Sequence, residues 1–114
     1  MVAFVDVDDL KGINDRQGHA AGDEALVKVV VAVREHLRSF DPIVRYGGDE
    51  FVAGVGGTET AGVERRFGVI VRSLREKHGI GISVGLATLT DDDTVDDLMA
   101  RADEELYSRR REDR

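Results

Sequence analysis

The chain has 114 residues, no cysteine and a formal net charge of −7, with 41% hydrophobic and 34% charged residues. This is the size and composition of one globular domain with one core, and the lack of cysteine excludes a disulfide framework or a thiolate metal site. No apolar run approaches the roughly 18 residues that span a bilayer, and the acidic balance argues against a DNA- or RNA-binding surface. We therefore expect a cytoplasmic domain without membrane contact, in which any phosphate ligand is bound through a metal ion or a local basic cluster.

The first half of the chain predicts a strand followed by two helices. Residues 2–5 are an apolar, β-rich run that ends in the acidic stretch 6–9, as expected for a buried strand with carboxylates at its C-terminal end. A short helix is predicted over residues 10–17. A longer helix is predicted to open at Gly22-Asp23 and to turn one apolar face inward, made of Leu26, Val29, Val30, Val33 and Leu37.

A hairpin is predicted next, with strands at residues 43–46 and 51–55 joined by Gly47, Gly48, Asp49 and Glu50. The two glycines permit backbone angles that other residues resist, which predicts a tight turn that a ligand can approach closely. The two acids beside this turn cannot belong to an apolar core. By itself the stretch is equally typical of a polar hairpin tip.

The second half predicts a helix over residues 60–77, a strand region over 80–87 and a last helix. The helix at 60–77 carries one apolar stripe, made of Val63, Phe67, Ile70 and Leu74. The last helix is predicted to begin with a capping box at 94–97 and to turn five residues inward, Val95, Leu98, Met99, Ala102 and Leu106. Helices and strands interleave, so the predicted fold class is α/β with an antiparallel hairpin in the sheet.

Two acids on separate predicted strands fit a divalent metal site. Asp6 ends the first strand and Asp49 lies at the hairpin tip. Two-metal nucleotidyl chemistry needs carboxylates from separate strands that converge on the ions, and Mg²⁺ prefers one or two carboxylates together with substrate phosphates. Asp6 and Asp49 therefore predict a Mg²⁺-dependent nucleotide site.

Several motifs in one order carry a resemblance to a known family. They are DVDDLKGIND at residues 6–15, GH at 18–19, GD at 22–23, GGDEF at 47–51, ISVGLA at 82–87 and RADEELY at 101–107. Together they resemble the GGDEF domain of bacterial diguanylate cyclases over residues 2–110. The resemblance implies one GGDEF domain at 1–114 without the usual N-terminal helix. It also implies an α+β, polymerase-palm-like fold with a mostly antiparallel sheet flanked by helices.

The resemblance also implies roles for individual residues. Asp6, the backbone carbonyl of Val7, and Asp49 would hold two Mg²⁺ (or Mn²⁺) ions per half-site, and either Asp49 or Glu50 would assist deprotonation of the ribose 3′-hydroxyl. The remaining substrate contacts would be made by the backbone N–H groups of Asp9 and Leu10, by the base-reading side chains of Asn14 and Asp23, by His19, and by the phosphate-binding Lys11, Arg110 and Arg114. Asp113 replaces the glycine that the family usually has before the arginine at 114, which weakens the last of these assignments.

By the same resemblance, the substrate would be GTP, with two molecules joined into cyclic di-GMP by an antiparallel homodimer. A carboxylate at Asp23 could accept from guanine N1–H and N2–H₂ together, whereas adenine offers no such donor pair. The alternative is an impaired GGDEF domain that binds GTP or cyclic di-GMP as a regulatory module.

Arg38 and Asp41 precede the hairpin at the position of the family's product-inhibition motif. The resemblance implies a second, inhibitory site for cyclic di-GMP there, since an arginine can hold a phosphate or guanine edge bidentately. The alternative interpretation is structural: a basic residue at the end of a helix and a turn aspartate before Pro42.

Asp8 remains open between a structural and a catalytic role. Asp6-Val7-Asp8 also has the Asp-x-Asp spacing of aspartyl phosphatases. Those enzymes place a small or hydroxyl residue shortly after the second acid, whereas residues 9–11 here are Asp-Leu-Lys, so that alternative is disfavoured.

Overall fold

The computed structural model describes residues 1–39, 41–56 and 59–88 and, beyond these, residues 94, 96, 97, 100, 101, 104 and 107. Its elements follow in the order β1 (Val2–Val7), α1 (Leu10–Gln17), α2 (His19–Glu35), β2 (Ile43–Arg45), β3 (Glu50–Gly54), α3 (Thr60–His78) and β4 (Ile82–Ala87). In this part of the chain the strands form one four-stranded sheet in the order β2-β3-β1-β4, and each neighbouring pair is antiparallel. The fold is α+β with an antiparallel sheet, as predicted.

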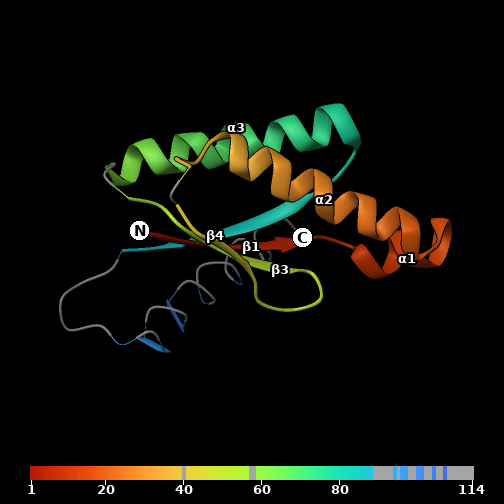
Figure 1. Cartoon of the computed structure of the whole chain (residues 1–114), viewed down its shortest axis with the longest axis horizontal. Helices are drawn as coiled ribbons and strands as arrows, with labels where there is room; N and C mark the ends of the chain where they lie inside the picture. Colours follow the sequence, from red (N-terminus) through yellow and green to blue (C-terminus); the bar gives the residue numbers. More distant parts are fainter. Residues whose placement is uncertain are drawn as a thin grey trace.

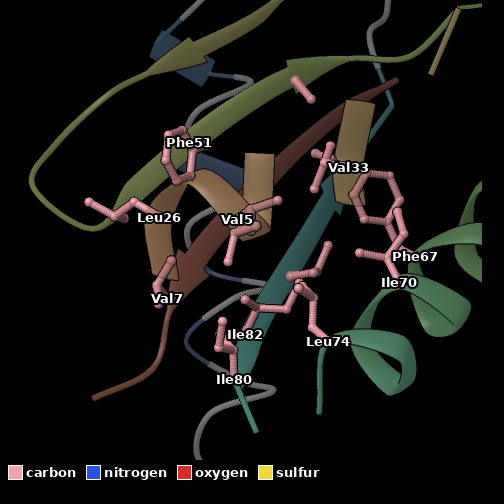
Figure 2. Close-up of a cluster of buried hydrophobic side chains, with 14 of the residues drawn as sticks. Val5, Val7, Leu26, Val33, Phe51, Phe67, Ile70, Leu74, Ile80 and Ile82 are labelled. Carbon is pink, nitrogen blue, oxygen red and sulfur yellow. The ribbon is translucent and has the colours of Figure 1, made fainter. Parts of the chain in front are cut away.

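The two longest helices, α2 and α3, lie together over one face of the sheet, and α1 lies beyond the C-terminal end of β1 (Figure 1). The core fills the space between these layers. Alternate residues of β1, namely Ala3, Val5 and Val7, point into it. They belong to the same core cluster as the predicted stripe of α3, and all four members of that stripe are buried, Val63, Phe67, Ile70 and Leu74. Figure 2 labels Val5, Val7 and the last three of these.

The opposite face of the sheet carries a smaller apolar cluster. Phe4 and Ala87 are buried there, with Val2 and Val52 packed against them. The ring of Tyr46 meets the ring of Phe4 edge-on, with centroids 5.8 Å apart. Because side chains alternate along a strand, Asp6 shares this face with Phe4. The first acid of the metal prediction therefore lies on the face of the sheet away from α2 and α3.

Several predicted boundaries differ from the structure. Helix α2 begins at His19, three residues earlier than expected, because the break between the helices is made by Gly18 alone, at φ 91°. Gly22 therefore lies inside α2, where it packs against α1. The helix ends at Glu35, and β4 begins at Ile82 instead of residue 80.

The predicted capping box near the C-terminus is confirmed. The N–H of Asp97 donates to Oγ1 of Thr94 at 3.1 Å, and the N–H of Thr94 donates to Oδ2 of Asp97 at 3.2 Å. The inward face predicted for this helix lies outside the described residues. None of the helices in the described ranges combines the length and hydropathy needed to cross a membrane.

Candidate active site

Three carboxylates meet where β1 and β3 lie side by side. Asp6 is paired directly with Glu50 in the register of these strands, and Asp49 immediately precedes Glu50 at the hairpin tip. One carboxylate oxygen from each of the three residues lies within 4.8 Å of the other two. The main chain joins the same elements, because the N–H of Val7 donates to the carbonyl of Asp49 at 2.9 Å. The sheet thus brings together two acids that are more than 40 positions apart in the sequence.

The chemistry of this acid cluster fits Mg²⁺. With a Mg–O bond of about 2.1 Å, opposite ligand oxygens around one ion are about 4.2 Å apart. The three carboxylate oxygens lie within 4.8 Å of one another, so they would have to move little to bind one ion. Asp6 is only 3% exposed. Burying a carboxylate beside two others is electrostatically costly unless positive charge is close. Asp6, Asp49 and Glu50 are therefore the residues that could hold such an ion.

The hairpin tip differs from the prediction in how its glycines act. Neither Gly47 nor Gly48 has a positive φ, so left-handed backbone is not the reason for the pair. A Cβ built at Gly48 would meet nothing within 4 Å, which leaves its backbone open to a ligand. The tip is held from one side by Arg45, whose guanidinium donates to the carbonyls of Gly47 at 3.1 Å and Gly48 at 2.7 Å.

A pocket of about 400 Å³ opens between α1, α2 and the hairpin tip. Six of the predicted substrate and metal residues line it: Leu10, Lys11, Asn14, His19, Asp23 and Asp49. Asp49 belongs both to this wall and to the acid cluster. A ligand in the pocket would therefore have one end beside the carboxylates and the other beside Asn14 and Asp23.

The back of the pocket depends on a close contact between the two helices. A Cβ at Gly22 would overlap Oδ1 of Asn14, so only glycine lets the Asn14 amide lie against α2. Among the described residues no donor reaches this buried Oδ1. Buried polar atoms in native proteins are nearly always hydrogen-bonded, so an unsatisfied acceptor in a pocket wall indicates a ligand donor.

Asp9, predicted to bind phosphate through its backbone, occupies an unusual conformation between β1 and α1. Its φ of 55° and ψ of 34° are left-handed, which is uncommon outside glycine although aspartate tolerates it better than most residues. The carboxylate extends along α1 over Gly12, where a Cβ would overlap it, and pairs with Arg16 at 3.1 Å. The side chain of Asp9 therefore does not line the pocket.

Sequence reasoning missed four residues of the pocket wall: Gly22 as a packing position, Leu26, Arg45 and Gly48. Leu26 is buried on the core face, as predicted, and it also borders the pocket, which helical periodicity does not indicate. Arg45 had a readable signal, since it is a cation placed directly before the acidic hairpin tip. Two predicted phosphate ligands, Arg110 and Arg114, lie outside the described residues.

The predicted inhibitory pair is arranged as a turn. Asp41 is 5% exposed, and its Oδ2 accepts from the backbone N–H of Arg38 at 2.9 Å. Its carbonyl accepts from Arg34 at 2.6 Å. These contacts match the structural alternative for Asp41. Arg38 itself is exposed, as a residue that binds an external ligand must be.

An acid cluster and an adjoining pocket on an antiparallel α+β fold define a candidate metal-dependent nucleotide site. Comparison with known proteins gives the family: the profile described as diguanylate cyclase, GGDEF domain, matches residues 1–114. The chain belongs to the GGDEF domain family.

Individual relatives agree with the family assignment. Diguanylate cyclase DosC of Escherichia coli K12 is 37% identical over 124 residues, covering 99% of this chain and 26% of DosC. Diguanylate cyclase A of Treponema denticola is 31% identical, covering 93% of this chain and 31% of that protein. The crystal structure of the GGDEF domain of DgcB from Caulobacter crescentus in complex with c-di-GMP superposes with a TM-score of 0.90 at 26% identity, covering 99% of this chain and 72% of that one. The chain thus spans about a quarter to a third of the length of these two curated relatives.

Proposed function

We propose that this chain is a diguanylate cyclase domain that binds GTP in the pocket and joins two GTP molecules into cyclic di-GMP with release of two diphosphates. The observation that carries the proposal is the double position of Asp49, which lies in the acid cluster and in the wall of the pocket lined by Asn14, His19 and Asp23. A nucleotide in this pocket has its base at one end and its phosphates at the other, next to the carboxylates. The relatives named diguanylate cyclases support the same reaction.

The residues of the pocket have complementary chemistry for GTP. Asp23 is exposed toward the pocket and accepts from the guanine N1–H and N2–H₂ donors, while the unsatisfied Oδ1 of Asn14 takes a further base N–H. Lys11, on the first turn of α1, pairs with the phosphates. The N–H groups at the start of α1 point in the same direction, because the first N–H groups of a helix have no partner within it.

Asp6, Asp49 and the carbonyl of Val7 would hold two Mg²⁺ ions, and Mn²⁺ suits the same oxygen ligands. Bound there, the metal would supply positive charge for the phosphates and for the attacking ribose oxygen. Asp49 or Glu50 takes the proton from the 3′-hydroxyl as the oxygen attacks the α-phosphorus of the second nucleotide and diphosphate leaves.

Two chains are needed for this reaction. The pocket beside the acid cluster has a volume of about 400 Å³, enough for one nucleotide. The product contains two, so each chain binds one GTP and the two sites face each other in an antiparallel homodimer. Product formation should therefore rise more steeply than linearly with protein concentration while dimerisation is weak.

The test is incubation of the purified chain with GTP and Mg²⁺, followed by chromatography of the nucleotides. We expect cyclic di-GMP to form, to be absent with ATP in place of GTP, and to be absent after removal of Mg²⁺ with EDTA. GTP binding without product at high protein concentration would contradict the enzymatic proposal. That result would leave this chain as a nucleotide-binding module.

We also propose that Arg38 and Asp41 form an inhibitory site for cyclic di-GMP. Arg38 supplies an exposed guanidinium, and Asp41 fixes the turn that presents it. Arg38→Ala should weaken cyclic di-GMP binding at this site by about ten- to hundredfold, since hydrogen bonds to charged groups contribute about 1.5–3 kcal/mol.

The measurement is calorimetric titration of cyclic di-GMP into the wild type and the variant. Arg72→Ala, an exposed arginine on α3, is the matched control and should leave binding unchanged. Equal affinity of the wild type and Arg38→Ala would remove the inhibitory site from this chain.

A further inference from the structure

Ser83 connects β4 to the turn that follows β1. Its side chain is 5% exposed, and its Oγ donates to Oδ1 of Asp8 at 2.8 Å. The main chain of Asp8 is held by the same strand end, because its N–H donates to the carbonyl of Gly81 at 2.9 Å. Both the side chain and the backbone of Asp8 are therefore tied to β4.

The residues on either side of Asp8 belong to the candidate active site. Val7 precedes it and offers its carbonyl to the metal in the proposed function. Asp9 follows it in the left-handed conformation, with φ 55°. This backbone is unfavourable for a residue with a Cβ, so the contacts of the turn must maintain it. The hydrogen bonds of Asp8 to Ser83 and Gly81 therefore constrain the backbone of both Val7 and Asp9.

The packing leaves Asp8 little freedom toward β4. A Cβ at Gly81 would lie 3.2 Å from Oδ2 of Asp8 and 3.8 Å from the guanidinium of Arg75. The carboxylate of Asp8 therefore lies close over bare backbone. Ser83 is also the β4 residue paired with Asp6 in the sheet register, so the anchor adjoins the metal-binding carboxylate.

We propose that Ser83 and Asp8 are positioning residues for the metal and triphosphate end of the site. The Ser83–Asp8 hydrogen bond holds the turn at 7–10 so that the Val7 carbonyl faces the metal ions and the N–H groups of Asp9 and Leu10 face the phosphates. This inference rests on the proposed function. It also assigns a role to Asp8 that the sequence left open between structure and catalysis.

The experiment compares Ser83→Ala with the wild-type chain by two measurements. The first is amide hydrogen exchange without nucleotide, in which exchange at residues 8–11 should become about tenfold faster while the core strands stay protected. The second is GTP affinity with Mg²⁺, which should fall about tenfold. Ser73→Ala on α3, the same chemical change at a half-buried serine away from the pocket, should alter neither.

A double-mutant comparison isolates the hydrogen bond. Asp8→Asn keeps an oxygen acceptor and should retain most of the affinity, whereas Asp8→Ala should lose at least as much as Ser83→Ala. The double variant Asp8→Ala with Ser83→Ala should be no worse than Asp8→Ala alone, because Asp8→Ala already removes the bond to Ser83. Additive losses would show that the two residues act independently and would overturn the proposal.

The two hypotheses fail in different ways. If the wild type binds no GTP, the proposed function fails and this role fails with it. If the wild type binds GTP but Ser83→Ala has the same amide exchange rates and the same GTP affinity as the wild type, only the role of Ser83 is overturned. A loss of protection spread over the whole sheet would also overturn it, since that result indicates a general contribution to stability.

Discussion

Asp6→Asn is expected to lower the rate of cyclic di-GMP formation by about a thousandfold, which corresponds to about 4 kcal/mol of barrier, with the fold preserved. Asparagine keeps the shape of the side chain but removes the charge that binds the metal. Asp6 is the buried member of the acid cluster, whereas Asp49 and Glu50 are half-buried. Asp49→Ala should have an effect of the same order, because Asp49 belongs to the acid cluster proposed to hold the metal and also lines the pocket.

Metal-linked stability provides a readout independent of turnover. At a Mg²⁺ concentration ten times its dissociation constant, binding stabilises the wild type by about 1.4 kcal/mol, which raises the thermal midpoint by about 4–6 °C. Asp6→Asn should lose this shift, and EDTA should abolish it in the wild type. Asp15→Asn, an exposed acid on α1, is the control and should keep both the shift and the rate. A normal Mg²⁺ shift in Asp6→Asn would contradict the assignment of Asp6 as a metal ligand.

Gly22→Ala is expected to reduce GTP affinity by about ten- to hundredfold, although alanine is the better helix former by about 1 kcal/mol. The new methyl group would overlap Oδ1 of Asn14 and displace the amide that reads the base. The overlapping atom is the end of a side chain that can rotate away. The thermal midpoint should therefore change little while GTP affinity falls.

Gly68→Ala is the matched control for this substitution. Gly68 also lies inside a long helix, α3, but a Cβ there would meet nothing within 4 Å. The Gly68→Ala substitution should raise the free energy of unfolding by up to about 1 kcal/mol and leave GTP affinity unchanged. Calorimetric titration and thermal unfolding of both variants provide the comparison. Undiminished GTP affinity in Gly22→Ala would contradict the proposed role of Asn14.

Much of the fold was readable from local patterns. The apolar stripe of α3 was predicted residue by residue, because burial on one face of a helix repeats every 3.6 residues and the charges fall elsewhere. The bounds of α1 and the capping box at Thr94 and Asp97 were also predicted, since both depend on residues a few positions apart. The start of α2 was wrong, because Gly22 looks like a helix opening in sequence but is a packing position in space.

The ordered motifs of the chain were sufficient to indicate the family, and the resemblance then implied its antiparallel fold and six of the residues in the pocket wall. Only the tertiary structure showed that Asp6 lies opposite Glu50, that Gly22 packs against Asn14, and that Asp8 is anchored by Ser83, 75 positions away. The physical reason is the range of the interactions. A hydrogen bond or a steric contact between distant segments depends on sheet register and helix packing, and neither leaves a local signal in the sequence.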